Sequence, residues 1–293
     1  MERVCLFCKS YLPDLERALA LAKTVWRYNS DELSFFISVP SAELRKFKDS
    51  LGSTGVEWLT DEDIVCQTSS DGVRLLSEMP GMLAQQVVKA EFWRTGLAQN
   101  YLCLDSDCLF IRPFGETDFL APDESPYSVL HEGKMFRQFC ATHGLAAALR
   151  ESDANKKVGL ALLGRKGPLY NFGPLPVIWS ARVWEALSDR FLSARGWSMF
   201  DAIRSHPHEA TWYGEALLNY EVIPVYPREP LFRAYLYLEE YEADQRMRVT
   251  TETLASDYLG VVFQSNWYPK RLGMSKNFAY KLKRELRKFR GIN

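Results

Sequence analysis

The chain has 293 residues, 47% of them hydrophobic, which is enough to bury the core of one large α/β domain. Its formal net charge of −1 gives no overall basic field, which argues against a nucleic-acid partner. No stretch reaches the ~20 apolar residues of a membrane span, and the six cysteines stand among apolar neighbours, as reduced thiols do. We therefore expect a cytoplasmic protein.

The first sixty residues alternate between strand and helix patterns. Apolar runs predict strands at residues 4–8, 33–40 and 56–59, with a helix after the first strand and a short helix from residue 41. The first helix is expected to be capped by Asp14 and to bury Leu15, Leu19, Ala22, Val25 and Trp26. Strands that alternate with helices predict an α/β fold with a mostly parallel sheet, whose ligands gather at the carboxyl ends of the strands.

Residues 79–93 predict a turn followed by a helix. Leu83, Val87 and Ala90 share its apolar face, whereas Gln86 and Lys89 belong to a polar stripe. Two interpretations stay open for that stripe. It is either an ordinary solvated face or a surface that reaches toward phosphate or sugar oxygens.

The apolar run at 101–104 ends in Asp105-Ser106-Asp107, and a second apolar run follows. This pattern indicates a buried strand that carries two carboxylates to its end. Buried carboxylates need a cation, hydrogen-bond donors or exposure, and Mg²⁺ or Mn²⁺ prefers such oxygen ligands. Solvated aspartates at a strand end are the alternative.

The second half of the chain is less regular. Residues 116–132 are rich in loop signals, 136–150 predict a helix, and the polar, then glycine-rich stretch 152–167 suggests a mobile flap. A strand at 177–180 precedes a helix at 181–191, and another helix opens near Glu209. The last predicted strand starts at 261 and runs into polar residues that include Asn266.

Three segments together resemble bacterial glycosyltransferases of the GT-A fold: Cys-Lys-Ser-Tyr at 8–11, the helix at 80–89 and the run at 101–110. More narrowly, they resemble a group associated with capsule and lipopolysaccharide sugar assembly. The resemblance implies a glycosyltransferase that uses a nucleotide-sugar donor, a saccharide or lipid-linked acceptor, and Mn²⁺ or Mg²⁺. It also implies that Asp107 contacts the metal directly and that Asp105 contacts the ribose or acts through water.

The resemblance and the patterns above give a set of expected site residues. For the donor these are Lys9, Ser10, Gln86, Lys89, Asp105 and Ser106. Glu209 is the candidate general base, with helix capping as its alternative and Glu215 in reserve. Trp179 and Tyr213 are the candidates for acceptor binding, although a core tryptophan would give the same pattern. Many GT-A enzymes supply a late histidine to the metal, but no histidine follows His208, so Asn266, Ser265 or water would have to serve.

Two other classes of function remain. A catalytically silent sugar-binding relative is one, because the late histidine is missing. A Mg²⁺-dependent phosphohydrolase of the haloacid dehalogenase type is the other, since its nucleophile also follows a strand as Asp-x-Asp. That motif normally lies near the N-terminus and has Thr or Val two residues on, where this chain has Leu109.

We expect residues 1–275 to form the GT-A-like domain and residues 276–293 to form a basic amphipathic helix. Phe278, Leu282, Leu286 and Phe289 recur at helical spacing among seven basic residues. That pattern is typical of a helix on an anionic membrane surface, which predicts a peripheral location at the inner face of the cytoplasmic membrane. Docking of the same stripe on the domain is the alternative.

Overall fold

The computed structural model describes residues 1–52 and 55–264. Its strands are β1 Glu2–Lys9, β2 Phe35–Val39, β3 Val56–Thr60, β4 Ala98–Asp105, β5 Cys108–Phe110, β6 Tyr127–Val129, β7 Val177–Ser180, β8 Tyr226–Arg228, β9 Phe232–Tyr235 and β10 Gly260–Phe263. Its helices are α1 Leu15–Tyr28, α2 Leu44–Leu51, α3 Asp61–Val65, α4 Gly72–Ser77, α5 Gly81–Glu91, α6 Lys134–Thr142, α7 Ala146–Leu163, α8 Ala181–Leu187, α9 Met199–Ser205, α10 Glu209–Tyr220, α11 Leu238–Arg246 and α12 Thr251–Ala255.

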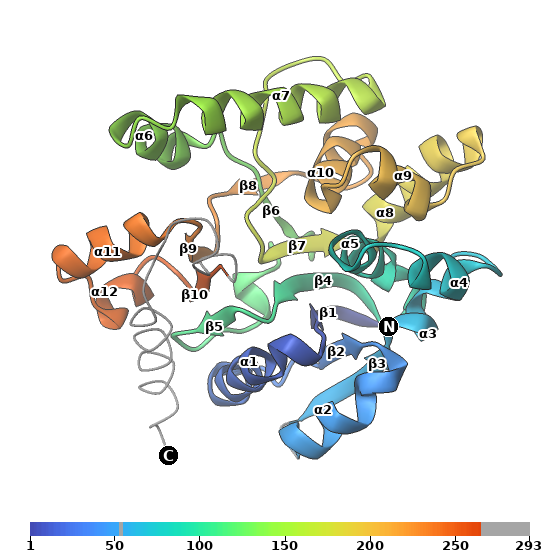
Figure 1. Cartoon of the computed structure of the whole chain (residues 1–293), viewed down its shortest axis with the longest axis horizontal. Coiled ribbons are helices and arrows are strands. Elements are labelled where there is room, and N and C mark those ends of the chain that lie inside the picture. The colour runs from blue at the N-terminus through green and yellow to red at the C-terminus, as the bar shows by residue number, and fades with distance from the viewer. Residues whose placement is uncertain (53–54, 265–293) are drawn as a thin grey trace.

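The central sheet has the strand order β3-β2-β1-β4-β7 (Figure 1). β1, β2, β3 and β4 run parallel, and β7 pairs antiparallel with β4. The three opening strands and the strand before Asp-Ser-Asp were predicted from their apolar runs, and the mostly parallel sheet is confirmed. Parallel strands are continuous apolar runs because both faces of such a sheet are covered.

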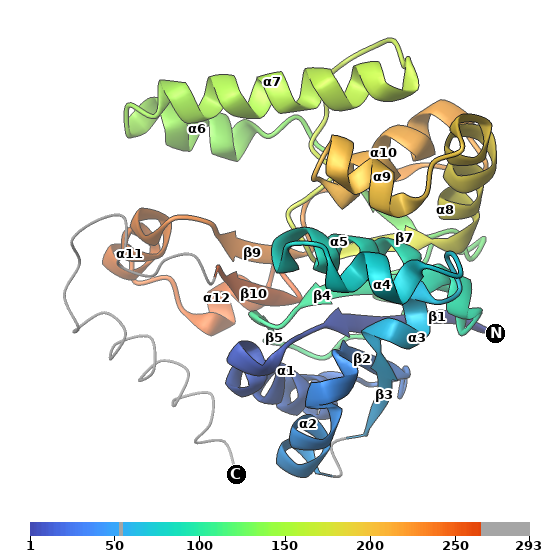
Figure 2. The same cartoon turned by 45° about the vertical axis from the view of Figure 1, so that its right-hand side comes forward.

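Two hydrophobic clusters cover the two faces of this sheet, with α1 and α2 on one side and α5 and α8 on the other (Figure 2). β1 shows the division, because Phe7 packs with the α5 and α8 cluster while Leu6 packs with the α1 and α2 cluster. Cys5 and Cys8 fall on opposite faces for the same reason, and burial raises the pKa of both thiols. Neither cysteine therefore has the environment of a reactive pair.

A smaller sheet, ordered β5-β10-β9, continues from the Asp-Ser-Asp turn. β5 pairs antiparallel with β10, and the backbone N–H of Phe263 donates to the carbonyl of Asp107 at 3.2 Å. β10 thus brings the described end of the chain beside that turn. Among residues 1–52 and 55–264, no helix has the length and apolar content needed to cross a membrane.

Two expectations about helices are wrong. Trp26 does not share the buried face of α1, since 75% of it is exposed and the buried residues are Ala18, Leu21, Ala22, Thr24 and Val25. The expected flap at 152–167 is mostly the second half of α7, which extends to Leu163. Asn155 and Lys157 are exposed on this helix, whereas Asp153 and Lys156 are partly buried and ion-paired. Gly159 lets α7 approach α10 so closely that a Cβ there would lie 2.3 Å from Thr211 Cγ2.

Candidate functional site

The carboxyl ends of β1, β2 and β4 meet at one edge of the central sheet. Lys9, at the end of β1, is in register with Ser38 on β2 and with Asp105 on β4. Beyond the strands, the hydroxyls of Ser10 and Ser106 lie 3.2 Å apart. The parallel pairing therefore brings together four of the expected donor-binding residues, at the edge where ligands of such sheets bind.

Lys9 is held by an acidic residue that the sequence interpretation did not single out. Its Nζ lies 2.9 Å from Oδ2 of Asp61, which begins α3 directly after β3, and Ser38 donates to the same carboxylate. Burial raises the pKa of Asp61, while Lys9 and Ser38 act in the opposite direction. The rule that identified Asp105, an acid that follows a predicted strand, would also have identified Asp61.

Lys89 joins the Asp-Ser-Asp turn to helix α10. Its buried Nζ lies 2.5 Å from Asp105 Oδ1 and 3.6 Å from Glu209 Oε1. Burial alone would lower the pKa of Lys89, but attraction by Asp105 and Glu209 outweighs burial and raises the pKa above its usual range. Lys89, for which a solvated face and a contact to phosphate or sugar oxygens were both open, is therefore a buried cation between two carboxylates.

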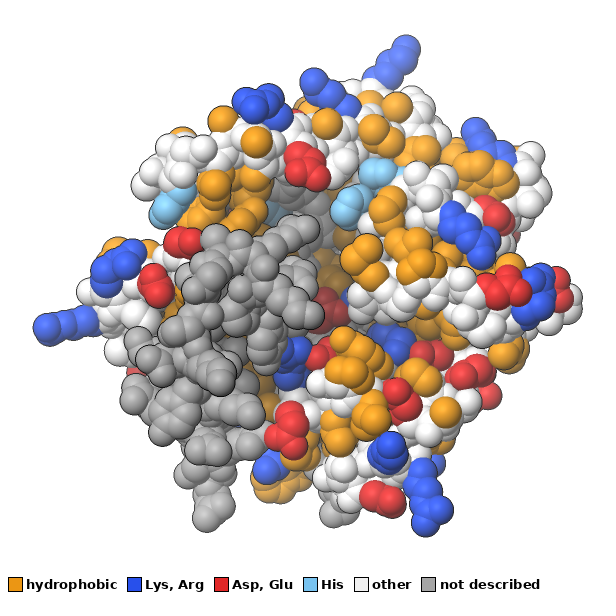
Figure 3. Space-filling view, viewed as in Figure 1, with side chains coloured by type: hydrophobic (Ala, Val, Ile, Leu, Met, Phe, Trp, Pro, Cys, Tyr) orange, Lys and Arg blue, Asp and Glu red, His pale blue; other side chains and the backbone are white. Residues whose placement is uncertain are grey.

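The same contacts place the candidate base beside the candidate metal-binding turn. Because one ammonium group contacts both, Asp105 Oδ1 and Glu209 Oε1 are at most 6.1 Å apart, the sum of 2.5 Å and 3.6 Å. Glu209 lies in the first turn of α10 and is 9% exposed. Figure 3 shows the molecular surface hollowed near its middle, with acidic and basic side chains at the floor of the hollow. Residues 104 apart in the chain thus share one site.

Replacement of Lys89 by methionine should destabilise the fold. The change leaves the carboxylates of Asp105 and Glu209 without their common cation, which we expect to lower the free energy of unfolding by about 3 kcal/mol. Urea unfolding measures this effect. Arg74→Met is the matched control, because its ion pairs with Asp71 and Glu78 are exposed and should be worth less than ~1 kcal/mol. Equal losses in the two variants would contradict the coupling of buried Lys89 to both carboxylates.

The carboxylates of Asp105 and Asp107 suit a hard divalent cation in their oxygen chemistry. Lys89 engages Oδ1 of Asp105. The direct metal contact that the resemblance implies for Asp107 stays a prediction. Within the described residues, no three His, Cys, Asp or Glu side chains are grouped to hold a metal ion. Asn266, the expected third ligand, lies outside the described residues, three positions after the residue that hydrogen-bonds Asp107.

Gln86, one turn before Lys89 on α5, is also buried. Its Nε2 donates to the carbonyl of Met82 at 3.2 Å, which fixes the orientation of the amide. Its Oε1 is buried and has no hydrogen-bond partner in the part of the chain that the structure describes. An unpaired buried acceptor costs free energy, so a hydroxyl donor beside it would be stabilising. The donor-binding role of Gln86 stays a prediction.

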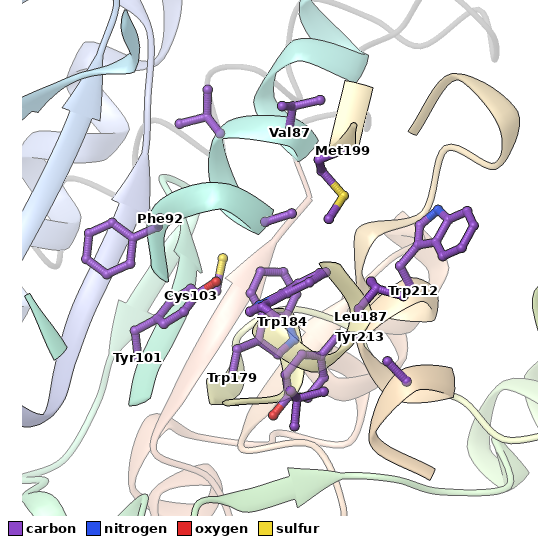
Figure 4. Close-up of a cluster of buried hydrophobic side chains, with 14 of the residues drawn as sticks. Val87, Phe92, Tyr101, Cys103, Trp179, Trp184, Leu187, Met199, Trp212 and Tyr213 are labelled. Carbon is purple, nitrogen blue, oxygen red and sulfur yellow. The ribbon is translucent and has the colours of Figure 1, made fainter. Parts of the chain in front are cut away.

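The acceptor-binding roles expected for Trp179 and Tyr213 are wrong. Trp179 is 1% exposed and Tyr213 is 4% exposed, so neither ring offers a face to a ligand. Figure 4 shows Trp179 packed against Tyr101 and Trp184, and Tyr213 packed against Trp184. The Tyr213 hydroxyl accepts from the backbone N–H of Ser180. The helices α8 and α10 cover this side of β7, which makes these aromatic residues part of the core.

Glu215, the reserve candidate for a base, is committed elsewhere. It is 2% exposed, and its carboxylate accepts two hydrogen bonds from the guanidinium of Arg165, at 2.5 Å and 3.1 Å. Such a bidentate pair fixes the segment after α7 against α10. Glu209 is therefore the acidic residue of α10 that faces the Asp-Ser-Asp turn.

The buried imidazole of His206, just before α10, makes stability depend on pH. Burial, with a smaller contribution from His208, lowers the pKa of His206 from 6.5 to about 4. Because the folded state favours the neutral ring, His206 makes its full contribution to the free energy of unfolding above about pH 6.5. That contribution is lost as the pH falls toward 4. We expect the Tm of the wild type to fall further between about pH 7 and about pH 4.5 than that of His206→Gln, by thermal unfolding. Parallel profiles would exclude this contribution.

Comparisons with known proteins agree with the architecture. A family model described as "Family of unknown function (DUF6492)" matches residues 4–268, and no curated protein matches the sequence. The solved structure of galactosyltransferase LgtC with donor and acceptor sugar analogs is similar, with a TM-score of 0.52, 11% identity, and coverage of 98% of this chain and 95% of that chain. Mouse xyloside xylosyltransferase 1 in its apo form gives a TM-score of 0.48, 11% identity, and coverage of 90% and 99%. The LgtC likeness shows the fold, and the GT-A-like α/β fold expected from the sequence is confirmed.

Proposed function

The chain belongs to DUF6492, a family of unknown function, and we propose that it is a metal-dependent glycosyltransferase that moves a sugar from a nucleotide-sugar donor to a saccharide or lipid-linked acceptor. One observation carries this proposal: in a GT-A fold, Lys89 holds Asp105 of the Asp-Ser-Asp turn and Glu209 of α10 at one point. The sequence resemblance extends the proposal to acceptors of bacterial surface polysaccharide synthesis.

The residues of the site can divide the chemistry among them. Asp107, with Asp105, would hold Mn²⁺ or Mg²⁺, which when bound neutralises charge on a departing diphosphate. Lys89 orients Asp105 and Glu209, and a carboxylate oxygen of Glu209 accepts the proton of the attacking acceptor hydroxyl. Lys9 neutralises Asp61, so the hydroxyls of Ser10 and Ser106 are the groups that we assign to the donor at this edge.

A panel of nucleotide sugars, with and without Mn²⁺, tests the proposal. We expect at least one nucleotide sugar to raise the Tm in a Mn²⁺-dependent way, because a ligand that binds only the folded state stabilises it by mass action. The same nucleotide sugar should release its nucleoside diphosphate when incubated with a suitable acceptor. Absence of any shift over the whole panel would overturn the proposal.

A catalytically silent sugar-binding protein is the second candidate. It is favoured by the observation that Lys9 and Lys89 already neutralise carboxylates of the protein. Neutralisation of a departing diphosphate would therefore depend on a metal. The same panel separates the two candidates. Binding without release of nucleoside diphosphate, over all acceptors supplied, identifies the silent protein.

A further inference from the structure

The small sheet β5-β10-β9 restrains the Asp-Ser-Asp turn through backbone hydrogen bonds. The N–H of Phe263, the last residue of β10, donates to the carbonyl of Asp107 at 3.2 Å. The next amide, that of Gln264, donates to the carbonyl of Tyr235 at the end of β9 at 3.4 Å. The end of β10 therefore lies between Asp107 and Tyr235, and a displacement of β9 would reach the turn through these two bonds.

Side chains reinforce this backbone path. Tyr235 and Phe263 are partners in the register of β9 and β10, and their rings stack with centroids 5.5 Å apart and 19° between the ring planes. The guanidinium of Arg233 lies 4.7 Å from the centre of the Tyr235 ring, and Tyr241 of α11 meets that ring edge-on at 5.4 Å. Tyr235 is 2% exposed, so its ring has little freedom to move and restrains the Phe263 ring that stacks on it.

A buried acid of α11 fixes the hydroxyl end of Tyr235. Asp244 is 7% exposed, and its Oδ2 accepts hydrogen bonds from the Tyr235 hydroxyl at 2.9 Å and from Nε of Arg233 at 3.1 Å. A buried charged network of this kind gives little net stability compared with apolar packing of the same volume. Hydrogen bonds to a carboxylate are directional, however, so this network gives Tyr235 and the end of β9 a defined position against α11, which lies beside them in Figure 1.

We propose that Tyr235, oriented by Asp244, is a positioning residue for the Asp-Ser-Asp turn. This inference rests on the proposed function, because it takes Asp107 as a ligand of the metal. Metal ligands have to be held within about 0.5 Å of the productive geometry, and residues that orient such ligands commonly contribute about 10–100-fold to metal affinity. Lys89 restrains Asp105 from the side of α5 and α10. Tyr235 restrains Asp107 from the side of β9 and β10, so separate parts of the fold hold the two acids of the motif.

Tyr235→Phe in the 293-residue chain tests the proposal, because it removes the hydroxyl that binds Asp244 and keeps the stacked ring. We expect Mn²⁺ alone, titrated by electron paramagnetic resonance, to bind this variant about tenfold more weakly than the wild type. Hydrogen exchange of the Phe263 backbone N–H, followed by NMR, should be about tenfold faster, because the end of β10 opens more easily. The exchange measurement requires neither metal nor activity.

Tyr213→Phe is the matched control. Tyr213 is also buried and its hydroxyl also makes a hydrogen bond, with the backbone N–H of Ser180 at 2.9 Å, but it belongs to the cluster on α8 and α10 rather than to β9. We expect a comparable fall in Tm in the two variants, with unchanged Mn²⁺ affinity and unchanged exchange at Phe263 in Tyr213→Phe. That result would separate positioning of the turn from a general loss of stability.

The other outcomes overturn the proposal. Equal losses of Mn²⁺ affinity in the two variants would reduce the effect to stability. Unchanged exchange at Phe263 in Tyr235→Phe would show that the hydroxyl does not restrain the turn, and faster exchange without weaker Mn²⁺ binding would show that the restraint does not serve the metal. Absence of Mn²⁺ binding by the wild type would overturn the metal role of the turn itself, and the exchange at Phe263 would still decide whether Tyr235 restrains it.

Discussion

Asp107→Ala is expected to abolish glycosyl transfer while the protein stays folded. The side chain belongs to the turn after β4, and the contact that Asp107 makes with β10 uses its backbone carbonyl, which alanine keeps. Loss of a ligand to the metal should remove several kcal/mol of transition-state stabilisation, which corresponds to about 10³-fold or more in kcat. Steady-state kinetics with saturating donor and Mn²⁺ measures the effect.

Asp49→Ala is the control for this variant, because Asp49 is an exposed acid of α2 far from the site. Its activity should equal that of the wild type. Thermal unfolding of Asp107→Ala should give a Tm close to the wild-type value, and the Mn²⁺-dependent part of the shift caused by a nucleotide sugar should be absent. Full activity in Asp107→Ala would contradict the assignment of the metal-binding turn.

The sequence was sufficient to predict the strands of the central sheet because they are buried on both faces. β1, β2 and β4 are continuous apolar runs, a pattern that does not depend on which helices cover them. The position of Asp105 and Asp107 at the end of a strand follows from the same runs. The position of Lys9 and Ser10 beside them follows from the parallel pairing, which places the carboxyl ends of β1 and β4 side by side.

The partners of the charged residues could not be predicted in the same way. An apolar run does not say which acid a distant lysine meets, and Lys89 contacts Asp105 and Glu209 only because α5 and α10 pack on the same face of the sheet. The sequence left the environment of Lys89 open because its two partners lie 16 and 120 residues further along the chain. Tertiary packing decided this environment.

The sequence also did not show which of the tryptophan rings are buried. Trp179 lies in an apolar run and Trp26 on the apolar stripe expected for the first helix, yet Trp179 is buried and Trp26 is 75% exposed. The difference comes from layers that only the full fold supplies, since α8 and α10 cover β7 while the side of α1 with Trp26 faces outward. Residue type alone therefore could not separate core rings from surface rings.

Glu209→Gln should lower kcat by about 10²–10⁴-fold and leave donor affinity nearly unchanged, if the enzyme inverts the anomeric centre. Glutamine keeps the size of the side chain and its place beside Lys89, but it cannot accept the proton of the acceptor hydroxyl. Glu215→Gln is the matched comparison, because Glu215 is also buried and ion-paired on α10. That variant should lose stability through its unpaired Arg165 while its kcat changes little.

Three measurements decide the role of Glu209. The anomeric configuration of the product comes first, because a product that retains the donor's configuration removes the need for a base at this position. Donor affinity from thermal shift and kcat from steady-state kinetics then separate binding from chemistry. Parallel losses of donor affinity and kcat would make Glu209 a structural partner of Lys89. A carboxylate that only positions Asp105 through Lys89 supports the donor complex and the transition state equally, so its removal would weaken both to the same extent.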